Sequence, residues 1–243
     1  MVHLDNALLL RSRLERGEPV VGLWNGIGGV ETAELLASCG PDFVVADLQH
    51  GPVAEHERPG VLAVIRASGV APLVRVRSSS FPDIGRPLDL GAAGVFVPNV
   101  RGVDHAAEAL SYCRYGPVGA RSIGRLSGGS DNPLCFLMLE TAQALAELDS
   151  ILGLEGIDGF YVGPYDLSLS LGKAGDDDRE EMTQIISSIL DRCVAARKPV
   201  GVHTNDGASA ASYRHAGATI VTAAMDRAVL RTSLWRELAV ARS

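Results

Sequence analysis

Short apolar runs recur along the chain and alternate with segments in which apolar residues have helical spacing. The runs are apolar throughout rather than at every second position, which is typical of parallel strands covered on both faces. Between two of them, Met182, Ile185, Ile186 and Ile189 follow one another at helical intervals. We expect eight strands, over residues 20–23, 43–46, 72–76, 94–97, 135–139, 159–162, 199–202 and 219–222.

The order of these elements predicts an α/β protein, a (β/α)8 TIM barrel. A doubly wound sheet is the alternative, but eight strand–helix pairs in one chain favour a closed barrel. The length of 243 residues agrees with that fold, since such barrels typically have about 250 residues. We therefore expect a single domain over residues 1–243, with a leading helix over about residues 4–16 and a last amphipathic helix that carries Leu230, Leu234 and Leu238.

Composition narrows the class of protein. A net charge of −7 without a basic stripe argues against nucleic acid as a partner. No apolar run approaches the length of a signal sequence core or a membrane span, which predicts no membrane partner and a cytoplasmic protein. The four cysteines lack the spacing of a zinc site, so we expect them to be buried thiols.

Two carboxylates follow predicted strands at the end where barrel enzymes carry their chemistry. Glu140 comes directly after residues 135–139, and Asp166 follows residues 159–162 and a Gly-Pro-Tyr turn. Such a pair suits a hard divalent cation such as Mg²⁺ or Mn²⁺. The structural alternative is that both acids belong to the first turns of helices.

Three further polar residues are expected on the same rim. Asp47 and His50 follow the second strand, where an aspartate that accepts the ring N–H would orient the imidazole as a base; a loop histidine bonded to its neighbours is the alternative. Arg75, or Arg77 if the third strand continues, would face a developing oxyanion. His203 closes the seventh strand and is a weaker candidate for contact with substrate. Together these residues indicate metal-assisted enolate chemistry.

Several motifs make the chain recognisable. It resembles the HpcH/HpaI family of metal-dependent class II pyruvate aldolases from about Val20 to the end of the last strand. The motifs are Asp47-Leu-Gln-His50-Gly, Leu73-Val-Arg75, Gly116-Pro-Val-Gly-Ala-Arg121-Ser-Ile-Gly124, Leu139-Glu140-Thr141 and Val162-Gly-Pro-Tyr-Asp166-Leu-Ser.

The resemblance implies an activity and a role for each rim residue. A 4-hydroxy-2-oxo acid would be cleaved reversibly into pyruvate and an aldehyde, through a metal-bound enolate. Glu140 and Asp166 would bind the metal, Mg²⁺, Mn²⁺ or Co²⁺. His50, paired with Asp47, would be the base, and Arg75 would stabilise the enolate.

The resemblance also predicts the substrate-binding residues, and here the chain departs from the family. Backbone N–H groups around Gly163, Pro164 and Tyr165 would hold the pyruvate carboxylate. Tyr165 replaces a small residue, and Met138 stands where the family usually has glutamine. The stretch 124–135, which often shapes the substrate entrance, is short. We therefore expect an aldehyde partner that differs from the family's usual acids.

Two other functions compete with the aldolase. One is a lyase acting on a CoA thioester of the citramalyl or malyl type, although such chains are usually longer. The other is a catalytically silent barrel that binds a metal–keto-acid complex. An imine mechanism is disfavoured because the only lysines, Lys173 and Lys198, lie away from the predicted rim. The resemblance further implies a homo-oligomer, a hexamer or trimer of dimers. Trp235 and the neighbouring leucines of the last helix agree with a partner-facing stripe, but an intrachain core explains them equally well.

Overall fold

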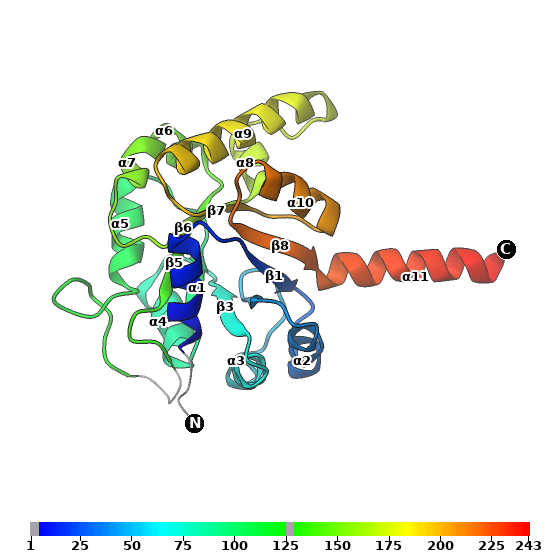
Figure 1. Cartoon of the computed structure of the whole chain (residues 1–243), viewed down its shortest axis with the longest axis horizontal. Coiled ribbons are helices and arrows are strands. Elements are labelled where there is room, and N and C mark those ends of the chain that lie inside the picture. The colour runs from blue at the N-terminus through cyan, green and yellow to red at the C-terminus, as the bar shows by residue number, and fades with distance from the viewer. Residues whose placement is uncertain (1–4, 125–128) are drawn as a thin grey trace.

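The computed structural model describes residues 5–124 and 129–243 and shows a closed barrel of eight parallel strands (Figure 1). The strands follow one another around the barrel in chain order, which confirms the predicted TIM barrel. Each predicted strand is present, with ends shifted by at most a few residues. The strands are β1 (Val20–Asn25), β2 (Phe43–Asp47), β3 (Ala71–Arg75), β4 (Gly94–Val97), β5 (Leu134–Leu139), β6 (Gly159–Val162), β7 (Val200–Val202) and β8 (Ile220–Met225).

Helices alternate with the strands and surround the barrel (Figure 1). The helical spacing noted around Met182 belongs to the long helix α9, whose buried face packs against the barrel. The helices are α1 (Asn6–Glu15), α2 (Val30–Ser38), α3 (Arg58–Ala67), α4 (Phe81–Asp89), α5 (Val103–Ser111), α6 (Ala142–Ala146), α7 (Leu148–Leu152), α8 (Pro164–Ser170), the 3₁₀ turn η1 (Asp176–Asp178), α9 (Arg179–Ala195), α10 (Gly207–His215) and α11 (Asp226–Arg242).

The core has two layers, one between the strands and the helices and one inside the barrel. The outer layer is mostly aliphatic. The inner layer is built from aromatic rings of fully buried residues, among them Trp24, Phe43, Phe96 and Tyr161. Glycine makes room for these rings: a Cβ at Gly22 would lie 2.2 Å from the Phe43 ring. The barrel interior is therefore packed, and chemistry is confined to its ends.

The stretch before β5 lies at the amino-terminal end of the barrel. Ser130 Oγ donates to Asp5 Oδ2 at 2.9 Å, beside the start of α1. Arg121 pairs with Asp89, the last residue of α4, at 3.2 Å. The described part of this stretch thus lies at the end of the barrel opposite to the chain's own rim, because a segment that leads into a strand reaches it at its amino-terminal end. That the stretch shapes a substrate entrance stays a prediction. Residues 125–128 lie outside the described residues.

The last helix, α11, projects away from the barrel (Figure 1). It contacts β1 and β8, and Asp226 at its start is its buried residue. The predicted amphipathic helix is thus present, but its apolar residues are exposed rather than packed into the core. No helix in the described part of the chain has both the length and the apolar character needed to cross a membrane.

The four thiols are unpaired. Cys113, Cys135 and Cys193 are buried, as expected, whereas Cys39 at the end of α2 is exposed. Burial in the apolar layer raises the pKa of the Cys193 thiol to about 12. The buried thiols are therefore packing residues, and they do not contribute to a polar site.

Candidate active site

Polar side chains form a ring at the carboxyl-terminal ends of the strands. Asp47 on β2 lies directly opposite Arg75 on β3 in the strand register. Because side chains alternate along a strand, Glu140 points inward like the interior Met138 two residues before it. His203 follows β7 directly and contacts the interior aromatic rings. The barrel thus brings four predicted rim residues from four strands to one end.

Asp47 and Arg75 form a buried ion pair that uses both carboxylate oxygens. Arg75 Nε donates to Oδ1 at 2.9 Å, and Nη2 donates to Oδ2. Oδ1 also accepts the backbone N–H groups of Gln49 and His50, and Oδ2 accepts the indole N–H of Trp24 at 3.3 Å. Burial alone would raise the pKa of Asp47, but the Arg75 guanidinium outweighs it and holds the pKa below its usual value. The cation is therefore fixed before any substrate arrives.

One expected contact is corrected. Among the described contacts, the His50 ring forms no hydrogen bond to Asp47; the backbone N–H of His50 donates to that carboxylate instead, at 3.1 Å. The reason lies in the register, which places Arg75 opposite Asp47 and saturates the carboxylate. His50 is exposed on the loop after β2. Arg77 is exposed beyond the end of β3, so Arg75 is the interior arginine of the two.

Glu140 is in the opposite state. Its side chain is buried, with 2% of its surface exposed, and Oε1 accepts the backbone N–H of Asn99 at 2.7 Å. Oε2 is buried and has no hydrogen-bond partner among the described residues. Burial raises the pKa of Glu140 to about 7; the Asn99 N–H opposes this shift, and the charge of Asp166 adds to it. A buried oxygen without a donor is costly, so this carboxylate is suited to bind a cation.

The predicted substrate-binding residues differ in position. Gly163 lies against Glu140, since a Cβ there would be 2.5 Å from Glu140 Oε2. Pro164 and Asp166 belong to the first turn of α8. Met138 is buried in the barrel interior, whereas Tyr165 is 73% exposed. Gly163 and Pro164 therefore border the rim, Met138 lies beneath it, and Tyr165 lies at its outer border.

An aromatic group beneath the rim was not predicted. The rings of Trp24 and Tyr161 stack with centroids 5.8 Å apart, and the His203 ring meets Trp24 edge-on at 4.8 Å. The Tyr161 hydroxyl is hydrogen-bonded to Thr222 Oγ1 and lies 3.4 Å from His203 Nδ1. The signal in the sequence was an aromatic or hydroxyl residue at an interior position in each of three strands. A search for apolar runs assigns such residues only to the core.

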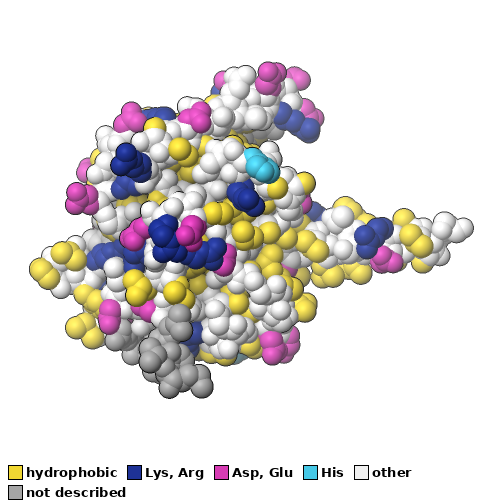
Figure 2. All heavy atoms as spheres, in the orientation of Figure 1, with side chains coloured by type: hydrophobic (Ala, Val, Ile, Leu, Met, Phe, Trp, Pro, Cys, Tyr) yellow, Lys and Arg dark blue, Asp and Glu magenta, His cyan; other side chains and the backbone are white. Residues whose placement is uncertain are grey.

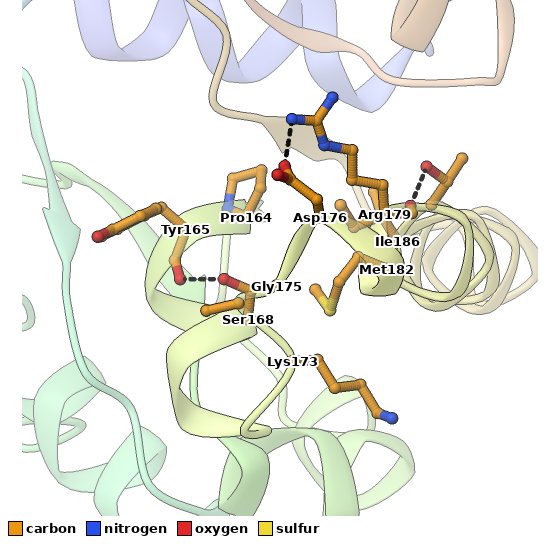
Figure 3. A pocket seen from close by; sticks show the side chains of 11 residues that line it. Pro164, Tyr165, Ser168, Lys173, Gly175, Asp176, Arg179, Met182 and Ile186 are labelled. Carbon is orange, nitrogen blue, oxygen red and sulfur yellow. Dashed lines mark hydrogen bonds and ion pairs between the residues drawn. The ribbon is translucent and has the colours of Figure 1, made fainter.

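A cleft of about 530 Å³ lies beside the rim, between α8 and α9 (Figure 3). Its two cations are paired, Lys173 with Glu181 at 2.7 Å and Arg179 with Asp176 at 2.5 Å. Figure 3 shows Tyr165 pointing outward from α8 at the border of this cleft. Lys198, the other lysine, lies just before β7 and donates to the backbone oxygen of Leu154. Neither lysine is placed to form an imine with a substrate on the rim.

The rim offers part of a divalent-cation site. In residues 5–124 and 129–243, no group of three or more His, Cys, Asp and Glu side chains could by itself hold a metal ion. Glu140 and Asp166, however, are close enough for the charge of one to raise the pKa of the other. Mg²⁺ is commonly bound by one or two carboxylates, with water and substrate oxygens completing its shell. The unpartnered Oε2 of Glu140 and this pair of acids therefore fit such an ion.

Comparison with known proteins identifies relatives along nearly the whole chain. The family model described as HpcH/HpaI aldolase/citrate lyase matches residues 21–233. A hydroxypyruvate/pyruvate aldolase of Rhizorhabdus wittichii is 34% identical, over 96% of this chain and 98% of the relative. A 4-hydroxy-2-oxo-heptane-1,7-dioate aldolase of Salmonella dublin is 31% identical, over 90% of this chain and 89% of the relative.

Solved structures show the same architecture. The crystal structure of a family protein from Burkholderia cenocepacia has a TM-score of 0.89 and 28% identity, covering 97% of this chain and 99% of that one. A family aldolase from Desulfitobacterium hafniense has a TM-score of 0.88 and 24% identity, covering 96% of both chains. The barrel and its added helices are therefore shared along nearly the whole length.

Proposed function

The chain belongs to the HpcH/HpaI aldolase/citrate lyase family, and from this premise we propose that it cleaves a 4-hydroxy-2-oxo acid reversibly into pyruvate and an aldehyde. It is a carbon–carbon lyase, since relatives with 31% to 34% identity over at least 90% of the chain are aldolases. One observation carries the proposal: a fixed cation, Arg75, and a buried carboxylate with a free oxygen, Glu140, lie on one rim. Because these relatives are named aldolases, a CoA-thioester lyase and a catalytically silent barrel are the weaker alternatives.

We infer that Glu140 and Asp166 hold a divalent cation, Mg²⁺, Mn²⁺ or Co²⁺. The unpaired Oε2 of Glu140 and the charge of Asp166 beside it support this assignment. When bound, such an ion supplies Lewis-acid polarisation of the substrate's keto group. Because the pKa of Glu140 is raised to about 7, cation binding and loss of the Glu140 proton are coupled.

The chain's own residues account for the rest of the chemistry. His50, exposed at the rim, would take the proton of the C4 hydroxyl, so that this carbon leaves as an aldehyde while the C3–C4 bond breaks. The electron pair of that bond remains on the pyruvate half, where the Arg75 guanidinium stabilises the developing charge on the keto oxygen. The proton held by His50 then returns to C3. Asp47 contributes by fixing Arg75.

The pyruvate half is assigned to the Glu140 side of the rim. Gly163 and Pro164 border that side, and the missing Cβ of Gly163 lets the Glu140 carboxylate lie directly against the backbone there. Met138 closes the floor with an apolar side chain. Tyr165, largely exposed, borders the outer edge. The small-molecule partners are thus a 2-oxo acid and an aldehyde that enters over the remaining rim.

The test is metal-dependent release of pyruvate. Metal-stripped protein is given racemic 4-hydroxy-2-oxo acids of several chain lengths, with and without Mg²⁺, Mn²⁺ or Co²⁺, and pyruvate is measured with lactate dehydrogenase. We expect pyruvate only with a metal, and a large loss in His50→Ala. His56→Ala is the matched control, because His56 is an exposed histidine of the same loop. Metal-independent release, or full activity of His50→Ala, would contradict the assignment.

The protruding helix supports a second proposal, that the protein is a homo-oligomer. Figure 2 shows hydrophobic side chains on the surface of the protruding helix. Leu234 is 52% exposed and Trp235 is 64% exposed. Val21 on β1, a strand that α11 contacts, is exposed as well. We propose that α11 packs on another copy, in a hexamer or trimer of dimers. Light scattering should show a smaller species for Trp235→Glu and an unchanged one for Glu237→Gln; an unchanged Trp235→Glu would contradict it.

A further inference from the structure

His203 occupies the part of the rim that the proposed chemistry leaves unused. It follows β7, while Glu140 and Asp166 follow β5 and β6, and Arg75 ends β3. The groups that act electrostatically on His203 include Arg75 and Asp47, so the imidazole lies near the fixed cation. The ring is partly buried rather than sealed off. These observations place His203 on the rim, beside the fixed cation.

The imidazole is held in a defined orientation. Its edge contacts Trp24 with ring centroids 4.8 Å apart at 77°, and Tyr161 with centroids 6.1 Å apart at 72°. Nδ1 lies 3.4 Å from the Tyr161 hydroxyl, which is also hydrogen-bonded to Thr222. Gly201 makes this arrangement possible, since a Cβ there would approach the Tyr161 ring to 2.9 Å. Residues of two strands thus contact the ring and hold one of its nitrogens.

The other nitrogen, Nε2, is left for a ligand. Among the described residues it has no hydrogen-bond partner, and it is not one of the buried polar atoms that lack one. It is therefore accessible. The Tyr161–Thr222 pair can orient its hydrogens in either sense, so Nε2 can be a donor or an acceptor.

The imidazole is uncharged at neutral pH. Burial, together with the nearby Arg75, lowers the pKa of His203 to about 4, although Asp47 opposes the shift. Arg75 itself is engaged by both oxygens of Asp47. A carboxylate is best recognised by a free cation, whereas a neutral imidazole suits an uncharged hydroxyl.

We propose that His203 Nε2 hydrogen-bonds a hydroxyl group of the aldehyde half, so that the enzyme prefers hydroxylated aldehydes over aldehydes of equal length without the hydroxyl. This inference rests on the proposed aldolase function and adds a specificity-determining residue to it. The pyruvate half has its own contacts on the Glu140 side, which leaves the wall formed by His203 for the aldehyde. Trp24 and Tyr161 act only through His203, as positioning residues.

The experiment compares two aldehydes that differ by one hydroxyl, glycolaldehyde and acetaldehyde, each condensed with pyruvate by the metal-loaded enzyme. The kcat/KM for each aldehyde is measured in wild type, His203→Leu and His203→Gln. We expect the preference for glycolaldehyde to fall by about three- to tenfold in His203→Leu, the worth of one neutral hydrogen bond. His203→Gln, whose amide reaches a similar point, should recover part of it. His215→Leu, an exposed histidine of α10, is the control.

A second readout separates this inference from the function beneath it. Exchange of the pyruvate methyl protons with deuterated water reports enolate formation without any aldehyde. No exchange and no condensation in the wild type would show that the aldolase proposal, and this inference with it, is wrong. Exchange without a wild-type preference for glycolaldehyde, or a preference that survives in His203→Leu, would overturn the role of His203 alone. So would an equal loss of exchange and of both condensations in that variant.

If His203→Leu does not fold, Tyr161→Phe carries the test. It keeps the ring and removes the hydroxyl that anchors Nδ1. We expect a smaller fall in the preference for glycolaldehyde, seen in KM more than in kcat. An unchanged preference together with normal folding would overturn the proposed orientation of the imidazole.

Discussion

The two sides of the rim hold the same chemical group in opposite states. On the β2–β3 side, the Asp47 carboxylate accepts hydrogen bonds from Arg75, from Trp24 and from two backbone N–H groups. On the β5–β6 side, Glu140 accepts one backbone N–H, from Asn99, and its Oε2 has no partner among the described residues. Both side chains are buried. Yet the pKa of Asp47 lies below its usual value, while that of Glu140 is raised to about 7.

The two sides differ in whether the chain itself compensates the buried negative charge. The Asp47 side satisfies its charge within the chain, so it contributes a preorganised cation and adds stability. The Glu140 side leaves a buried acid undercompensated, which costs free energy unless a ligand completes it. Changes on the first side should therefore reduce folding stability as well as activity. Changes on the second should remove activity while sparing stability.

The largest expected effect comes from Glu140→Gln. Loss of one of two cation-binding carboxylates should lower pyruvate formation by about 10³-fold or more, since the ion's charge stabilisation is worth several kcal/mol. The free energy of unfolding without metal should stay the same or rise, because glutamine has no charge to bury. Mn²⁺ titration should show weakened binding, and the exposed Glu155→Gln is the control. A marked loss of stability in Glu140→Gln would contradict the expected difference between the two sides.

On the other side, Arg75→Met should cost about 3–5 kcal/mol of unfolding free energy, because it leaves the buried Asp47 charge without its cation. Urea denaturation measures this, and the exposed Arg77→Met should change it little. Asp47→Asn combined with Arg75→Met should recover part of the stability and none of the activity, since the fixed cation is still missing. A loss under about 1 kcal/mol would mean that the pair behaves like a surface salt bridge.

A pH series should sharpen the comparison through His203, which burial and Arg75 keep uncharged. Its pKa is about 4 in the folded protein and about 6.5 when unfolded. Between these values the unfolded chain binds the extra proton, so stability rises as pH increases through that window. The contribution is at most about 3 kcal/mol. In metal-free protein, the unfolding free energy of wild type should therefore rise relative to that of His203→Leu between about pH 4.5 and about pH 7. A difference independent of pH would contradict it.

The fold was largely predictable from the chain, because its signals are local. Continuous apolar runs marked β2 and β4 within one residue of their observed ends, since a strand covered on both faces has no polar position to obscure it. The rim followed, because residues such as Glu140 and Arg75 stand where such runs end.

What could not be predicted depends on which residues meet across strands. His50 is near Asp47 in sequence, but the register of β2 and β3 gives that carboxylate to Arg75. Tyr161 and Thr222 belong to strands far apart in the chain and read as core, yet they anchor His203. The outward course of α11 was equally hidden, because an apolar stripe has the same pattern whether its own barrel or another surface covers it.

The smallest expected effect tests whether the Asp47 carboxylate has more hydrogen-bond donors than its stability requires. Trp24→Phe keeps an aromatic ring in the barrel but removes the indole N–H that donates to Asp47 Oδ2 at 3.3 Å. Because the lost ring volume also costs stability, the hydrogen bond is isolated by a double-mutant cycle with Asp47→Asn, and we expect a coupling of about 1 kcal/mol. Mn²⁺ binding at Glu140 should not change. No coupling would mean that Arg75 alone satisfies the carboxylate, and a coupling above about 3 kcal/mol would mean that the stability of this side depends on every donor to Asp47.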